Sequence, residues 1–178
     1  MSVKITESYV NYNPPFDYSA ITNRLLATVP EKFLVGLDSV VLCNLAGQPR
    51  RIRTGTLPRR GRRIKRENVA GLYHHESRSQ KAWIQIFVDK IAMPRPYRWI
   101  RVMRELMLGV VFYHELGHHV HTIRPEYREE EDVADNWGHR FLVNHLRQSH
   151  RLFYWFLRLV RTLRRKRGQP PMNADERG

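Results

Sequence analysis

The chain has 178 residues, of which 42% are hydrophobic, and these values suit one globular domain with a sizeable core rather than two domains. A single cysteine, Cys43, excludes an internal disulfide and fits a reducing compartment. No apolar stretch approaches the roughly 20 residues of a transmembrane helix, and the N-terminus lacks the apolar segment of a signal peptide. We therefore expect a soluble, cytoplasmic protein.

The net charge of +14 is concentrated in two segments. Residues 50–66 hold nine Lys and Arg and residues 147–167 hold eight, while neither segment contains an acid. The remaining 14 basic residues face all 17 acidic ones, so the body of the chain is close to neutral. We expect a single domain over 1–167, with a basic loop at 50–66, a basic C-terminal helix at 147–167 and a disordered tail at 168–178.

The first half of the chain is predicted to supply a small sheet. Residues 1–20 form an extended lead-in, and residues 18–37 have the apolar spacing of a helix, with Ser19 as its N-cap. A short apolar strand at 38–45 is followed, at 48–67, by a flexible loop or the arms of a long hairpin. Residues 68–76 and 81–89 are predicted to be paired strands joined by a short polar turn, because the second alternates in the period-2 pattern of a half-buried strand.

Two long helices are predicted in the second half. The first covers roughly 97–122 and becomes largely apolar toward its end, so we expect it to be buried. The second follows Pro125, has acidic residues in its first turn, where they suit the helix dipole, and runs to about 147. It continues, bent or broken, to 166.

A cluster of metal-binding residue types lies near the end of the first long helix. Residues 114–118 read H-E-L-G-H, so His114 and His118 lie one turn apart on the same helix face. Two imidazoles at that spacing can bind one zinc ion at about 2 Å each. Glu115 lies beside the first histidine, where a carboxylate can take a proton from a zinc-activated water. This pattern predicts metal-assisted hydrolysis of an amide, with Zn²⁺ as cofactor.

A catalytic zinc needs a third protein ligand, which we expect from the second helix. His121 shares the face of His114 but lies about 10.5 Å further along the helix, which is too far for one ion. Glu131 lies about one turn into the second helix, opposite His118 if the two helices are antiparallel. Asp135, one turn later, can accept an N–H from a zinc-binding imidazole. The small residues Gly117, Ala134 and Gly138 permit close helix approach, while Glu129 and Glu130 are interpreted as a solvated first turn.

H-E-L-G-H followed by E-x-x-A-D at 131–135 resembles the gluzincin metalloproteases, and the small body is most similar to the ImmA/IrrE group of intracellular regulatory peptidases. The resemblance implies zinc ligands at His114, His118 and Glu131, a general base at Glu115 and an orienting carboxylate at Asp135. It implies an α+β fold of zincin type, with an antiparallel sheet of about three strands packed on a long active-site helix and a return helix. It also implies that the edge strand at 82–89 binds a protein or peptide substrate by strand addition, through Trp83, Ile84, Gln85, Ile86 and Phe87.

The residue that stabilises the transition state is left open by the sequence. The candidates are His119, His121, His139, Tyr73 and Tyr113, and for each of them a structural or exposed role is favoured.

The basic segments allow several partners. Residues 147–167 are interpreted as an amphipathic helix packed on the body, ahead of a nucleic-acid contact and of an anionic membrane surface. The arginines considered as nucleic-acid contacts are Arg59, Arg60, Arg62, Arg63, Arg164, Arg165 and Arg167. The sequence thus favours an intracellular, regulatory zinc endopeptidase, and the alternative is a nucleic-acid-binding protein with a structural or vestigial metal site.

Overall fold

The structure is a computed structural model that describes residues 3–54, 56–59, 62–65, 68–78, 80–91, 95–126 and 129–167. The fold is α+β. Its strands are β1 (Lys4–Ser8), β2 (Leu37–Cys43), β3 (Thr56–Arg59), β4 (Arg62–Lys65), β5 (Gly71–His74) and β6 (Ala82–Phe87). Its helices are α1 (Tyr18–Leu26), α2 (Arg50–Arg53), α3 (Arg101–Ile123), α4 (Glu130–Ser149) and α5 (Arg151–Arg167). Among the described residues, none of these helices is both long enough and apolar enough to cross a membrane.

The main sheet is mixed, with the strand order β1-β2-β6-β5. Strand β2 pairs in parallel with both β1 and β6, and only β5 runs antiparallel, on β6. The predicted antiparallel sheet of about three strands is therefore wrong. Part of the predicted extended lead-in forms strand β1. Long connections between β1, β2 and β6 allow these three strands to run in the same direction, and local sequence patterns do not reveal this parallel pairing.

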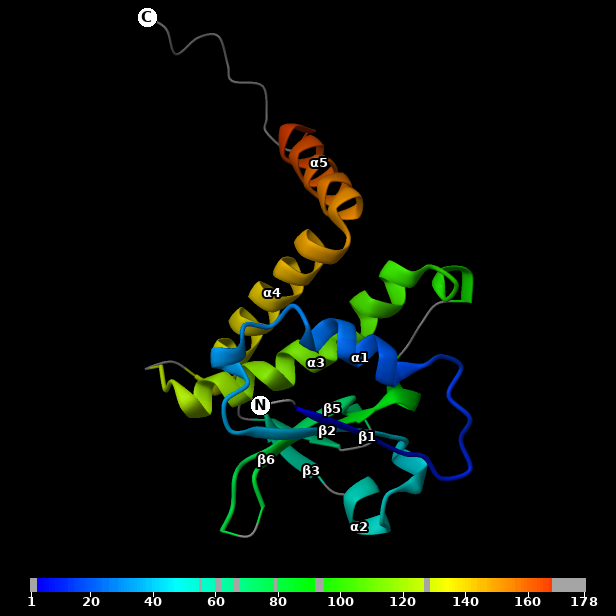
Figure 1. The fold of residues 1–178 in the computed structure, drawn as a ribbon, viewed down its shortest axis with the longest axis vertical. Helices are drawn as coiled ribbons and strands as arrows, with labels where there is room; N and C mark the ends of the chain where they lie inside the picture. The colour runs from blue at the N-terminus through cyan, green and yellow to red at the C-terminus, as the bar shows by residue number, and fades with distance from the viewer. Residues whose placement is uncertain are drawn as a thin grey trace, which may run out of the picture.

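Helices α1 and α3 lie on one face of the sheet (Figure 1). The core between them contains fully buried residues from each layer, among them Leu25, Val40, Ile84 and Leu108. The predicted helix at 18–37 is shorter than expected, because α1 ends at Leu26 and Pro30 lies in the following turn. Its N-cap is Asp17, whose carboxylate accepts a hydrogen bond from the Ala20 N–H at 2.7 Å, rather than Ser19.

Helices α3 and α4 form the antiparallel pair that the sequence predicts, and their backbones pack closely at two glycines. A Cβ added at Gly117 would lie 2.7 Å from the Ala134 Cα, which is closer than atoms can approach. A Cβ at Gly138 would lie 3.1 Å from the backbone nitrogen of His114. The missing side chains allow the first turns of α4 to lie directly against the end of α3.

The two basic segments differ in structure. Strands β3 and β4 pair as an antiparallel hairpin within the segment predicted to be a loop or hairpin arms. The C-terminal basic segment is broken at His150, where α4 ends and α5 begins. The predicted disordered tail at 168–178 lies outside the described residues.

Candidate metal centre

Three side chains with metal-binding atoms meet where α3 and α4 cross. His114 and His118 lie one turn apart on α3, and their Nε2 atoms are 3.3 Å from each other. Glu131, in the first turn of α4, places one carboxylate oxygen 3.6 Å from His114 Nε2 and the other 3.7 Å from His118 Nε2. One donor atom from each of the three residues lies within 4.8 Å of the other two. The structure thus brings together all three residues that the sequence predicts as ligands.

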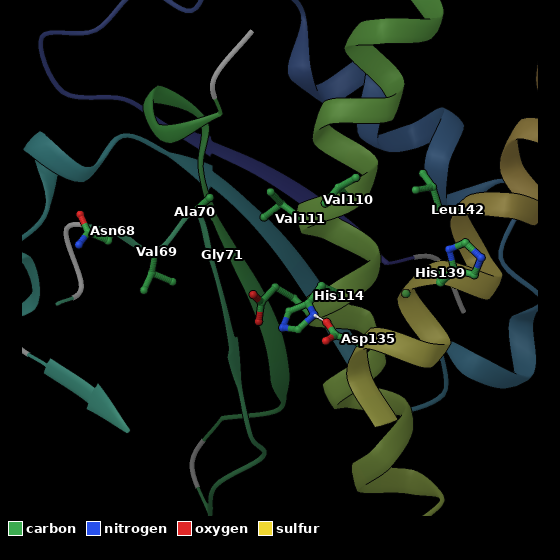
Figure 2. A pocket seen from close by; sticks show the side chains of 12 residues that line it. Asn68, Val69, Ala70, Gly71, Val110, Val111, His114, Asp135, His139 and Leu142 are labelled. Carbon is green, nitrogen blue, oxygen red and sulfur yellow. Dashed lines mark ion pairs between the residues drawn. The ribbon is translucent and has the colours of Figure 1, made fainter. Parts of the chain in front are cut away.

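Each of the two imidazoles is oriented by a carboxylate on its other nitrogen. His114 Nδ1 lies 2.9 Å from Asp135 Oδ1, which is the contact expected for Asp135 (Figure 2). His118 Nδ1 lies 3.0 Å from Glu130 Oε1. The interpretation of Glu130 as only a solvated first-turn acid is therefore wrong. The sequence does place Glu130 directly before the predicted ligand Glu131. It does not show that the first turn of α4 is oriented so that the Glu130 side chain points toward His118.

These contacts test whether the residues fit a metal ion. An ionised carboxylate can only accept hydrogen bonds, so each Nδ1 donates to its carboxylate and each ring turns its Nε2 toward Glu131. The two Nε2 atoms and the two carboxylate oxygens then face one another across less than 4 Å. A cation placed between these atoms would be attracted by all of them. Imidazole nitrogen with carboxylate oxygen is a donor set that zinc takes. The residues fit the ion.

Glu115 lies beside this donor set, on the side of α3 that faces the sheet. It is only 6% exposed and lies against β5, where a Cβ at Gly71 would be 2.7 Å from its Cγ. It lines a cleft of about 560 Å³ together with His114, Asp135 and residues 68–71. Figure 2 shows this cleft between Ala70 and Gly71 on one side and helices α3 and α4 on the other. A carboxylate, the candidate donor set and open space for a ligand thus adjoin one another.

The side chains considered for transition-state stabilisation separate into two groups. Tyr113 is fully buried and its hydroxyl donates to the Leu25 carbonyl at 3.0 Å, so it belongs to the core. His119 is also buried, between the Tyr73 hydroxyl at 3.1 Å and the Val35 carbonyl at 3.0 Å. Burial lowers the pKa of the His119 imidazole, so it stays neutral at lower pH than an exposed histidine.

Three candidates remain. The Tyr73 hydroxyl is held by His119, at 3.1 Å from its Nδ1. His121 has a buried Nδ1 for which no hydrogen-bond partner is found among the described residues, and it does not belong to the donor set. His139 is exposed and lines the cleft. It is the candidate whose position agrees with a role in catalysis.

The strand predicted to bind substrate is not at the edge of the sheet. Strand β6 pairs with β2 on one side and with β5 on the other, so its backbone has no side left for a substrate. The expectation for Trp83, Ile84, Gln85, Ile86 and Phe87 is therefore wrong. The edge beside the cleft, among the described strands, is β5. The alternating pattern of 81–89 predicts a half-buried strand but does not say which strand of the pair lies outermost, and in the structure every residue of β6 except Trp83 is buried.

A second cluster of charged side chains, which the sequence analysis missed, lies at the far end of α4. The fully buried Glu105 on α3 contacts Arg24 at 2.6 Å and Arg101 at 2.8 Å through Oε1. Its Oε2 contacts His150 at 2.6 Å and His145 at 3.1 Å. Burial alone would raise the pKa of Glu105, but hydrogen bonds from Arg101, His150 and Arg24 lower it to about 2. These partners are 40 or more residues away in three cases, so local spacing could not identify them.

The arginines predicted to contact nucleic acid are not tested by the structure. Arg60 lies outside the described residues. The same holds for the side chains of Arg59, Arg62, Arg63, Arg164, Arg165 and Arg167, of which only the backbone is described, in β3, β4 and α5.

Comparison of this chain with protein-family models, with curated proteins and with solved structures found no match.

Proposed function

We propose that this protein is a zinc-dependent endopeptidase of gluzincin type, similar to the ImmA/IrrE-type intracellular peptidases. The observation that carries the proposal is the convergence of His114 Nε2, His118 Nε2 and both oxygens of Glu131, beside the buried carboxylate of Glu115 in a cleft. With Cys43 as its single cysteine the chain has no internal disulfide, which suits action in the cytoplasm.

In this proposal, His114, His118 and Glu131 hold the zinc ion, while Asp135 and Glu130 keep the two imidazoles in the tautomer that presents Nε2. When bound by these residues, a zinc ion would supply Lewis acidity, which would lower the pKa of a water molecule to about 7 and polarise the substrate carbonyl. Glu115 accepts a proton from the attacking water and passes it to the leaving amine, since its carboxylate lines the cleft. Contact with Gly71 limits the directions in which that carboxylate can point.

The substrate is proposed to bind as an extended strand along β5. This strand is the sheet edge nearest to the cleft, and Gly71, its first residue, is in contact with Glu115. Backbone pairing would place a scissile bond beside the base while leaving side chains free to enter the cleft. This replaces the edge-strand role that the sequence analysis gave to β6.

Metal binding tests the first part of the proposal. Purified protein is expected to carry one zinc ion per chain, measured by elemental analysis. Glu131→Gln should remove the zinc or weaken its binding strongly, because one of three ligands is lost. Glu129→Gln is the matched control, since Glu129 is exposed and lies just outside the donor set. Equal zinc content in both variants would contradict the assignment of Glu131.

Hydrolysis tests the second part. Glu115→Gln should keep the metal but lower the rate of cleavage of an unfolded protein substrate by about 10²–10⁴-fold, as for loss of a general base. Comparison of cleavage fragments across the host proteome between wild type and Glu115→Gln would identify the natural substrate. Undiminished cleavage by Glu115→Gln would refute the role of Glu115.

A further inference from the structure

Helix α5 carries a stripe of exposed apolar side chains. Leu152 is 88% exposed, Phe156 59% and Leu159 58%, and their spacing of four and three residues places them on one helix face. Among the described residues, the main contacts of this helix are with α4, and the helix extends away from the sheet and from α1 (Figure 1). The expectation that the basic C-terminal helix packs on the body is therefore wrong. A monomer in water does not usually expose such a continuous apolar face.

A second side of α5 carries positive charge and a hollow. The hollow has a volume of about 610 Å³ and is lined by Arg147, Gln148, Arg151, Tyr154, Trp155 and Arg158. The three arginines face no acidic residue within 147–167, because this segment contains none. Trp155, which is 61% exposed, lies between the hollow and the apolar stripe in the helical register. An exposed Trp or Tyr beside apolar and cationic groups is typical of a helix at a membrane–water interface.

Three kinds of partner could bind α5, and they differ in whether they would cover the apolar stripe, neutralise the arginines or do both. A second copy of α5 would cover the apolar stripe but would bring together two segments with eight basic residues each and no acids. A nucleic acid would neutralise the arginines but leave Leu152, Phe156 and Leu159 in water, because its surface offers no aliphatic partner. An anionic lipid surface accepts the apolar stripe in its acyl boundary and the guanidinium groups at its phosphates.

We propose that α5 lies in the plane of an anionic phospholipid surface. Leu152, Phe156 and Leu159 enter the acyl boundary, and Arg151 and Arg158, on the flank of the stripe, contact the lipid phosphates. This inference uses no residue of the metal centre, so it stands or falls independently of the proposed protease activity.

Co-sedimentation of the full chain with vesicles tests the proposal. The protein should bind vesicles of phosphatidylcholine mixed with phosphatidylglycerol and should not bind phosphatidylcholine alone. The double variant Leu152→Gln/Phe156→Gln should reduce the binding constant by at least about tenfold, because two buried side chains are lost. Arg151→Gln/Arg158→Gln should also weaken binding and make it less sensitive to salt. Val35→Gln is the control, since Val35 is 63% exposed and its carbonyl contacts His119 near the end of α3, whereas α5 begins beside Glu105 near the start of α3.

The depth to which Trp155 enters the lipid can be measured separately from the affinity of the protein for vesicles. Its fluorescence should shift to the blue on vesicle binding and be quenched by brominated lipid, and Trp155→Phe should remove both signals. Equal binding to neutral and anionic vesicles, or none to either, would overturn the proposal. A concentration-dependent dimer that Phe156→Gln abolishes, or binding of DNA without binding of vesicles, would overturn it in favour of the competing partner.

Discussion

Replacement of Gly117 by alanine should damage the proposed metal centre although Gly117 is not one of its proposed ligands. The added Cβ would lie 2.7 Å from the Ala134 Cα and 2.9 Å from its carbonyl carbon, both of which are backbone atoms that cannot rotate away. An ordinary contact between carbon atoms begins near 3.4 Å, so α4 would have to retreat by about 0.7 Å at this point. Ligand distances in a zinc site tolerate only about 0.2 Å. Glu131, one turn before Ala134, would move with the helix and leave the two imidazoles.

The expected loss of stability follows from two opposing effects. Overpacking costs about 1–3 kcal/mol, and the better helix propensity of alanine offsets about 0.5–1 kcal/mol of it. Gly117→Ala should therefore lower the free energy of unfolding by about 1–2 kcal/mol, and zinc affinity by tenfold or more. Chemical unfolding and competition with a chelator measure the two effects.

Gly109→Ala is the matched control for this substitution. It lies in the same helix, but its new Cβ would meet the flexible end of Leu142 at 3.1 Å, so it should be neutral or stabilising. If Gly117→Ala bound zinc and unfolded like Gly109→Ala, the close approach of the two helices would not be what positions Glu131.

Three further outcomes test other contacts. Asp135→Asn and Glu130→Gln should each weaken zinc binding by about 10–100-fold, measured by chelator competition, because each removes the carboxylate that orients one imidazole; unchanged affinity in both would contradict that role. Gly71→Ala should retain zinc but lose hydrolysis, since its Cβ would displace the carboxylate of Glu115, and full activity would show that the base is not held by β5. The pKa of Glu105 is about 2 in the folded protein, against 4.5 for the unfolded chain. Its ionised carboxylate therefore contributes about 3 kcal/mol to the free energy of unfolding above pH 4.5, and this contribution is lost as the pH falls toward 2. The difference in unfolding free energy between wild type and Glu105→Gln, measured by urea denaturation, should shrink over that range, and a constant difference would refute this account.

The features that sequence predicted well depend on helix periodicity. One turn separates His114 from His118, and the short connection between α3 and α4 places Glu131 opposite them. The requirement for small residues at Gly117 and Gly138 follows from the same antiparallel geometry. Each of these relations involves residues fewer than about 25 positions apart, for which spacing along a helix determines position in space.

The features that sequence did not predict depend on long-range contacts. Parallel pairing of β2 with β1 and β6 joins residues that are roughly 35 to 45 positions apart, so the periodic pattern of each strand leaves the order open. The Glu105 cluster joins Arg24 to His145 and His150 through one carboxylate. The amphipathic pattern of α5 identified an apolar face, but not that the body leaves this face exposed.

Helix α4 is attached to α3 by different forces at its two ends. Near the metal centre the attachment is close packing at Gly117 and Gly138, whereas at the far end it is the buried charge of Glu105. Burying an ion cluster costs desolvation energy, and apolar residues of similar size often give equal or greater stability. We expect the Glu105 cluster to fix the direction of α5 relative to α4, because His150 is the residue between the two helices and contacts Glu105.

His150→Gln should loosen the joint between α4 and α5. The variant should be cut by trypsin severalfold faster at Arg147 or Arg151, which flank the joint, while zinc affinity at the other end of α4 remains unchanged. His139→Gln is the control, since His139 is exposed on α4 and lies outside the cluster. If tryptic cleavage at the joint were equally slow in both variants, the contact between His150 and Glu105 would not hold α5 in place, and the short contact with α4 alone would set its direction.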